Sequence, residues 1–265
     1  MRPIVAFLTD FGTRDHYAGV MKGVVLSICP ESTVIDVSHD LPPHDVAAAA
    51  YELAATYKFF PAGTIFVTVV DPGVGSTRRG IAVEAGDWKF VAPDNGVLTM
   101  VLRETPAKRA VELTERRYAR PTISRTFEGR DRFAPAAAWI AKGTAMTALG
   151  RPAHDLVELD LPGMEETREE IQGAVVRIDR FGNAITNIDR KAFDRLAAGR
   201  AVVIEALGKP VARIVATYTD IGPGEVCALF GSTEHLELAV QSGSAAEKIG
   251  LTFGSQIAVK RGAVI

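Results

Sequence analysis

Short apolar runs alternate with helical periodicity through the first half of the chain. The run at 64–70 is apolar almost throughout, which is typical of a strand covered on both faces. In 17–28, by contrast, apolar residues recur at helical spacing up to a stop at Pro30. Strands are expected at 4–8, 33–37 and 64–70, and helices at 17–28, 46–58 and 134–142. The β-α-β-α-β order predicts a mostly parallel sheet with helices on both sides.

The pattern changes near 161–170, where Pro162 and Gly163 precede a run of glutamates. Short strands separated by Gly-, Pro- and Asp-rich turns follow, which predicts a small β-barrel or sandwich. These strands are expected at 174–178, 201–205, 211–218, 226–230, 236–240 and 256–259. We therefore expect a mostly parallel α/β sandwich domain in 1–165 and a smaller β-rich domain in 171–265.

Composition narrows the classes of function. The 265 residues are 47% hydrophobic and 23% charged, with a net charge of −2, which gives no reason to expect nucleic acid or a membrane as a partner. The N-terminus enters an apolar strand at once and lacks a leader pattern, so a cytoplasmic protein is expected. Cys29 and Cys227 stand far apart, and the five histidines form no H-x-x-x-H pair, so no metal is expected.

Two carboxylates stand where predicted strands end. Asp10 follows the first strand, and ligands of open α/β sheets bind at that edge, where a carboxylate can accept both hydroxyls of a ribose. Asp71 ends the third strand in V-V-D-P-G-V-G-S-T-R-R, with Arg78 within reach. Such a pair at a cleft can hold and polarise a water molecule. A strand-terminal aspartate beside a surface arginine is the simpler interpretation of the second motif.

Three further motifs are ambiguous when taken singly. A-P-D-N-G at 92–96 reads as a turn. T-F-E-G-R-D-R-F-A-P at 126–135 is either a chemical site or a surface ion-pair cluster that caps a helix. D-R-F-G-N-A-I-T-N at 179–187 places amides beside an aromatic ring, which suits an adenine, although a hairpin would explain it equally.

The order of these motifs, followed by a late S-x-x-x-L-x-L-A-V, resembles the S-adenosylmethionine hydroxide adenosyltransferases over essentially the whole chain. The fluorinase and chlorinase are relatives of that family. The resemblance implies an enzyme that splits S-adenosyl-L-methionine into adenosine and methionine with water, with no cofactor. It also implies a homotrimer that binds its substrate between the N-terminal domain of one subunit and the C-terminal domain of the next.

The resemblance assigns roles to individual residues. Asp71 and Arg78 match the catalytic Asp and Arg around the attacking water, but the family's catalytic histidine is Glu128 here. Asp10 corresponds to the carboxylate that holds the ribose hydroxyls. The other implied substrate-binding residues are Asp179 and Asn183 at the methionine and adenine parts, Phe181 on the adenine, Ser232 at the methionine carboxylate, and Tyr17, Asn95 and Tyr218 in the pocket. The arginine that follows this serine in the halogenases is replaced by Thr233.

Three alternative functions stay open. The chain could bind S-adenosylmethionine or adenosine as a sensor, having lost turnover through Glu128. It could use a halide as nucleophile, but the charge of Asp71 would repel an anion, and Gly129 matches the pattern of relatives that do not fluorinate. It could be a metal-dependent hydrolase that uses Asp10, Asp71 and Asp94.

Overall fold

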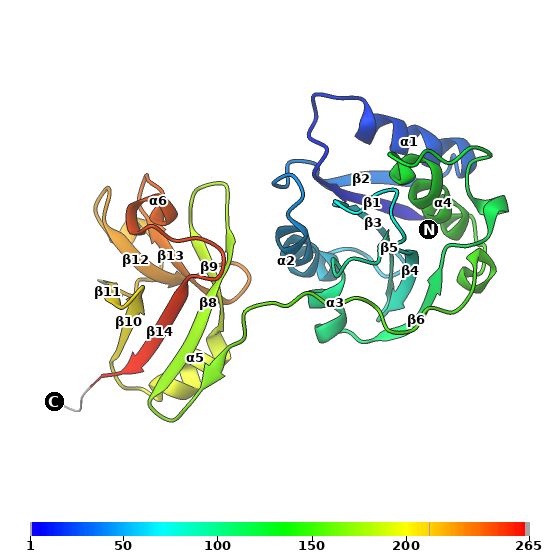
Figure 1. Ribbon diagram of the computed structural model, residues 1–265. Coiled ribbons are helices and arrows are strands. Elements are labelled where there is room, and N and C mark those ends of the chain that lie inside the picture. The colour runs from blue at the N-terminus through cyan, green and yellow to red at the C-terminus, as the bar shows by residue number, and fades with distance from the viewer. Residues whose placement is uncertain (1, 212, 263–265) are drawn as a thin grey trace. The chain divides into compact units, whose positions relative to one another are not determined.

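The computed structural model describes residues 2–211 and 213–262 and contains two compact units (Figure 1). The N-terminal unit is Met1–Leu159, and the C-terminal unit is Asp160–Ile265. The boundary lies just ahead of Pro162 and Gly163, in a segment without regular structure.

A six-stranded sheet forms the centre of the N-terminal unit, in the order β2-β1-β3-β5-β4-β6. Its strands are β1 (Ile4–Thr9), β2 (Thr33–Ser38), β3 (Ile65–Val69), β4 (Gly80–Ala85), β5 (Trp88–Pro93) and β6 (Ala107–Glu112). The strands β2, β1, β3 and β5 run parallel, whereas β4 is antiparallel to β5 and β6. The predicted mostly parallel sheet is therefore confirmed.

Helices cover both faces of this sheet (Figure 1). The α-helices are α1 (Tyr17–Ile28), α2 (Val46–Thr56), α3 (Thr99–Glu104) and α4 (Ala134–Ala141), with shorter turns at Tyr57–Phe59, Arg116–Tyr118, Gly129–Phe133 and Met146–Leu149. The helices α1 and α4 pack on one face and α2 and α3 on the other, because each presents apolar residues at helical spacing. Within the described ranges, no helix is long and apolar enough to cross a bilayer.

The strand order creates a topological switch point beside β1. The chain leaves β1 through α1 toward β2, and it returns through α2 to place β3 on the opposite side of β1. Loops that follow β1 and β3 therefore diverge at the carboxyl edge of the sheet, where ligands of such folds bind. Leu8 pairs with Thr68 and Thr9 with Val69, so the segments beginning at Asp10 and Val70 emerge side by side.

The C-terminal unit is an antiparallel sheet that is nearly closed into a barrel, as predicted. Its elements are β7 (Glu165–Glu166), β8 (Glu170–Ile178), β9 (Ala184–Asp189), α5 (Arg190–Ala197), β10 (Val202–Ala206), β11 (Lys209–Val211), η5 (Tyr218–Asp220), β12 (Val226–Phe230), β13 (His235–Val240), α6 (Ala245–Ile249) and β14 (Gln256–Arg261). The first part of β8 pairs with β14 and its second part with β9, so the sheet turns a corner along this strand.

The strand predicted at 211–218 is wrong at residues 213–218. Val211 is the last residue of β11, and Ala212 lies outside the described residues. Ile214 forms a single bridge to Ala228, and a 3₁₀ turn begins at Tyr218. The reason is local: the Asp220 carboxylate accepts hydrogen bonds from the backbone of Ala216 (3.1 Å) and Thr217 (3.0 Å). A side chain that binds these amides favours a turn over a sheet ladder.

We expect Asp189→Ala to destabilise the C-terminal unit by about 1 kcal/mol. The Asp189 carboxylate caps α5 by accepting a hydrogen bond from Ala192 N at 2.8 Å, and alanine leaves this N–H without a partner. Urea unfolding measures the change. Asp189→Asn keeps an acceptor and serves as the matched control, so an equal loss in both variants would contradict the capping role.

Candidate functional site

Asp71 and Arg78 meet on the connection between β3 and β4. This connection begins and ends at the carboxyl edge of the parallel strands, because β4 runs antiparallel to them. Arg78 Nε donates to both carboxylate oxygens of Asp71, at 3.0 and 2.9 Å, and Nη2 donates to Oδ2. Their side chains are only 10% and 5% exposed, so the predicted pair exists and is largely shielded from solvent.

Glu128 contacts the same guanidinium. Arg78 Nη2 forms an ion pair with Glu128 Oε2, and Glu128 Oε1 lies 3.6 Å from Arg132 Nη2. A glycine makes this approach feasible: at Gly75, with φ of +77°, a Cβ would lie 2.3 Å from Arg125 O. Glycine thus lets the β3–β4 connection pack against the segment that carries Glu128. The structure therefore brings Glu128 together with Asp71 and Arg78, the other two residues predicted to be catalytic.

The guanidinium of Arg78 keeps one nitrogen for other partners. Nε and Nη2 bind the two carboxylates, while Nη1 has no partner among the described residues. The ring of Phe133 lies 5.2 Å from the guanidinium carbon. Burial alone would lower the pKa of Arg78, but the hydrogen bonds and charges of Asp71 and Glu128 outweigh it and raise the pKa. The cation is therefore permanent and has a donor to spare.

Asp10 and Tyr17 lie on the neighbouring connection, between β1 and α1. Asp10 Oδ2 accepts a hydrogen bond from His44 N at 2.8 Å. Tyr17 is 39% exposed and packs edge-on against Phe127, with ring centroids 5.1 Å apart, and Phe11 lies 5.8 Å away. Phe127 directly precedes Glu128, so this aromatic group adjoins the ion-pair cluster.

Asn95 and Asp94 follow β5 at the same edge. Asn95 Nδ2 donates to Val70 O at 2.9 Å, next to Asp71, so this amide holds the backbone of the β3–β4 connection. Asp94 is bound by Arg79, with Nε at 2.8 Å from Oδ2. In 2–211 and 213–262, no three His, Cys, Asp or Glu side chains are grouped as metal ligands. Because arginines already pair with Asp71 and Asp94, the geometry does not favour the metal-dependent alternative.

In the C-terminal unit, Asp179 and Asn183 form one hydrogen-bonded turn. Asp179 Oδ1 accepts from the backbone of Phe181 and Asn183, both at 2.8 Å, and Oδ2 accepts from Asn183 Nδ2 at 2.9 Å. This turn presents the ring of Phe181 outward with 76% of the residue exposed. A rigid turn with an exposed aromatic face is suited to stacking against a base.

Tyr218 leads to a residue that the sequence motifs did not single out, Glu237. Tyr218 Oη donates to Glu237 Oε2 at 3.2 Å, and Glu237 is 6% exposed on β13. Burial and the charge of Asp179 raise the pKa of Glu237, while the tyrosine opposes this; burial and Glu237 raise the pKa of Tyr218 to about 12. Ser232 is exposed in the turn after Gly231, against which Glu237 packs. A charged residue inside the apolar run 236–240 was the available signal.

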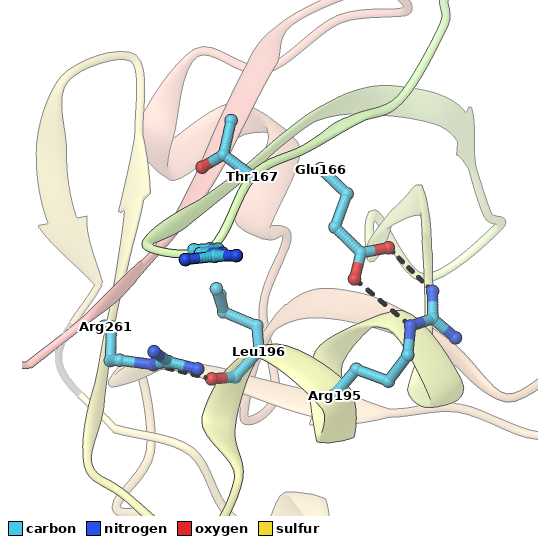
Figure 2. A pocket seen from close by; sticks show the side chains of 6 residues that line it. Glu166, Thr167, Arg195, Leu196 and Arg261 are labelled. Carbon is cyan, nitrogen blue, oxygen red and sulfur yellow. Dashed lines mark hydrogen bonds and ion pairs between the residues drawn. The ribbon is translucent and has the colours of Figure 1, made fainter.

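A cavity of about 690 Å³ in the same unit contains none of the predicted site residues (Figure 2). It is lined by Glu166, Thr167, Arg168, Arg195, Leu196 and Arg261. Arg195 is paired with Glu166 at 2.6 Å, and Arg261 Nε donates to Leu196 O at 2.9 Å, as Figure 2 shows. The cavity is thus bordered by ion pairs of the fold and does not coincide with the motif residues.

Comparisons with known proteins match both units of the chain to one family. Residues 5–150 match the SAM hydroxide adenosyltransferase N-terminal domain, and residues 173–258 match the C-terminal domain. An (R)-S-adenosyl-L-methionine hydrolase from Thermus thermophilus is 39% identical, over 97% of this chain and 99% of the relative, and one from Salinispora tropica is 37% identical over 98% of each. A fluorinase from Nocardia brasiliensis is 29% identical over 98% of each.

Solved structures agree with the fold. The crystal structure of an uncharacterized conserved protein from Thermotoga maritima superposes with a TM-score of 0.91 at 34% identity. The match covers 97% of this chain and 100% of that one.

We expect the free energy of unfolding of Glu237→Gln to increase, relative to that of the native chain, as the pH rises from about 4 to 8. A carboxyl whose pKa is raised by folding contributes stability below its ordinary value of 4.5, and this contribution is lost as the pH rises through the raised value. Glutamine does not titrate and avoids that loss. Urea unfolding at several pH values measures the difference between the two proteins, and a difference independent of pH would contradict the raised pKa.

Proposed function

This chain belongs to the SAM hydroxide adenosyltransferase family, and on that premise we propose that it hydrolyses S-adenosyl-L-methionine to adenosine and L-methionine. The observation that carries the proposal is the shielded Asp71–Arg78 pair at the carboxyl edge of β3, next to the connection that begins with Asp10 after β1. It joins a carboxylate and a guanidinium at the switch point where α/β folds bind ligands.

The reaction requires activation of water rather than of the leaving group. The sulfonium of the substrate departs as a neutral thioether, so no acid has to protonate it. Water is a weak nucleophile and must be held in line with the carbon–sulfur bond, about 3–3.5 Å from the ribose 5′ carbon. The oxygen–carbon bond forms as the carbon–sulfur bond breaks, and the electron pair of that bond goes to sulfur. The water loses one proton.

Asp71 and Arg78 have complementary roles in this step. The Asp71 carboxylate orients the water and accepts its proton, since it keeps lone pairs beyond those used by Arg78. Nη1 of Arg78 donates a hydrogen bond to the oxygen as negative charge develops on it. The two carboxylates fix the guanidinium beforehand, so little reorganisation is needed during the reaction.

Glu128 acts as a positioning residue in this proposal. Its contact with Nη2, the nitrogen that also binds Asp71, helps to hold Arg78, at the position where the family has a histidine. The negative charge of Asp71 disfavours a halide ion as the nucleophile, because like charges repel by several kcal/mol where solvent is excluded.

The remaining assignments extend the same proposal. Asp10 binds the ribose hydroxyls, with Tyr17 and Asn95 beside it in the N-terminal unit. In the C-terminal unit, the substrate-binding residues are Asp179, Phe181, Asn183, Tyr218 and Ser232. The enzyme uses no cofactor, assembles as a homotrimer, which sedimentation would test, and works in the cytoplasm, where free cysteines such as Cys29 and Cys227 stay reduced.

Incubation of the protein with S-adenosyl-L-methionine in H₂¹⁸O tests the function. We expect adenosine and methionine, with ¹⁸O in the 5′ hydroxyl of adenosine as measured by mass spectrometry. Asp71→Asn keeps the shape but cannot accept the proton, and we expect kcat to fall by about 10²–10⁴-fold. Asp87→Asn is the matched control, because Asp87 lies in the β4–β5 turn at the opposite edge of the sheet.

Other products would decide against this function. Unchanged substrate that binds tightly would indicate a sensor. A 5′-halo-5′-deoxyadenosine formed in high chloride would indicate halide chemistry. 5′-Methylthioadenosine together with ¹⁸O-labelled homoserine would place the attack on the methionine side of the sulfonium.

A second prediction concerns Glu128. Glu128→Gln removes the charge that holds Arg78 Nη2, and we expect kcat to fall about tenfold with KM for the substrate nearly unchanged. Glu128→His restores the residue found in the family and should give a higher kcat than Glu128→Gln. Steady-state kinetics measures both variants, and native kcat in Glu128→Gln would contradict a positioning role.

A further inference from the structure

We propose that His39 is a positioning residue for Asp10: it fixes the L-T-D-F-G turn so that the carboxylate meets the ribose hydroxyls. This inference rests on the proposed function, because it assumes that Asp10 binds a ribose. His39 lies just after β2, outside the motifs noted in the sequence, and only 5% of it is exposed. A buried imidazole held on both nitrogens is a rigid support for a neighbouring loop.

His39 joins three elements of the N-terminal unit. Its Nδ1 lies 2.8 Å from Thr9 Oγ1 at the end of β1, and its Nε2 lies 3.0 Å from Asp36 Oδ1 on β2. Lys22 on α1 donates to the other oxygen of Asp36 at 2.6 Å. Burial would raise the pKa of Asp36, but Lys22 and His39 outweigh it and lower the pKa, so this carboxylate stays ionised.

The hydrogen-bond partners of His39 indicate which ring nitrogen carries the proton. A carboxylate only accepts, so Nε2 carries a proton and donates it to Asp36. In the neutral ring, Nδ1 then accepts from the hydroxyl of Thr9. The hydroxyl oxygen is left to accept the backbone N–H of Phe11 at 3.2 Å. The chain of hydrogen bonds therefore runs from the α1 lysine to the residue that follows Asp10.

The backbone of His39 reinforces the same turn. Gly12 N donates to His39 O at 2.7 Å, and Gly12 has a φ of +67°, which glycine adopts without strain. The two residues that follow Asp10, Phe11 and Gly12, therefore both have hydrogen-bonded backbone amides. Its own Oδ2 accepts from His44 N, and His44 has a left-handed φ of +68°.

A β-bulge near the end of β2 places His39 beside the turn after β1. Phe7 pairs with Asp36 and Leu8 with Ser38, so Val37 is an extra residue that bulges from the ladder. Bulges occur beside active sites, where they redirect a side chain. Here the shift coincides with the residues between Asp36 and His39. The connection after β2 consequently lies against the turn after β1, and Asp10 Oδ1 is left without a partner among the described residues.

Nucleoside binding tests this role without relying on turnover. Isothermal calorimetry measures Kd for adenosine and for 2′-deoxyadenosine, which lacks one hydroxyl. In the native protein we expect 2′-deoxyadenosine to bind about 10–100-fold more weakly, since a charged acceptor loses its donor. In His39→Ala we expect this ratio to fall below about threefold, because the Kd for adenosine rises toward that for 2′-deoxyadenosine, which stays nearly unchanged.

Two conservative variants separate the contacts of the ring. An asparagine amide reaches about as far as Nδ1, so His39→Asn should retain most of the ratio through Thr9. A glutamine amide reaches about as far as Nε2 and Asp36, so His39→Gln should behave like His39→Ala. Tyr57→Phe is the matched control, because it removes hydrogen bonds to Glu104 and Thr105 from a buried side chain on the opposite face of the sheet. It should lower the melting temperature and leave the ratio unchanged.

The outcomes separate this inference from the proposed function. If the native protein hydrolyses its substrate and discriminates the two nucleosides, but His39→Ala weakens both equally, His39 is only structural and the inference is overturned. A native protein that hydrolyses the substrate without discriminating the nucleosides would also overturn it, because Asp10 would not read the hydroxyl. A native protein that neither binds nucleoside nor turns over would remove both proposals.

Discussion

The pairing of β1 with β2 on one side and β3 on the other is the constraint on which the N-terminal unit depends. Parallel strands need crossover helices, and these helices must cover opposite faces for β2 and β3 to flank β1. The connections that follow all three strands then emerge at one edge. The antiparallel β4 begins at that edge, so both ends of the β3–β4 connection, which carries Asp71 and Arg78, lie there.

Charge within this edge is arranged around one guanidinium. Arg78 is held by Asp71 and Glu128, and all three side chains are mostly buried. Removing such charges from water is costly unless they are paired, and the paired arrangement keeps Arg78 ionised. The Asp71 carboxylate would repel a halide ion but can bind a neutral water molecule. Glu128 thus supplies one of the two carboxylates that hold Arg78.

Around Asp71, Arg78 and Glu128, several polar side chains form hydrogen bonds that hold loops in place. Asn95 holds the carbonyl of Val70, His39 and Thr9 hold the turn after β1, and Asp94 binds Arg79. The C-terminal unit uses the same device, since Asp179 fixes the turn that presents Phe181. In both units, carboxylates and amides that the motifs mark as binding residues also satisfy backbone donors or acceptors. Their positions are thus fixed before any ligand arrives, which lowers the entropy cost of binding.

The sequence determined the fold class, the order of the main elements and most of the motif positions, because apolar periodicity and strand-end carboxylates are local signals. It did not predict β4, β5 and β6, and it mistook 213–218 for part of a strand, where Asp220 binds the local backbone instead. Only the tertiary structure decided that Glu128 faces Arg78, that Asp94 is bound by Arg79, and that Glu237 and His39 are buried beside predicted site residues. These contacts join residues 15 to 50 positions apart or come from neighbouring strands. The directions of these side chains depend on the order of strands in the sheet, on the β-bulge in β2 and on the close packing that Gly75 allows.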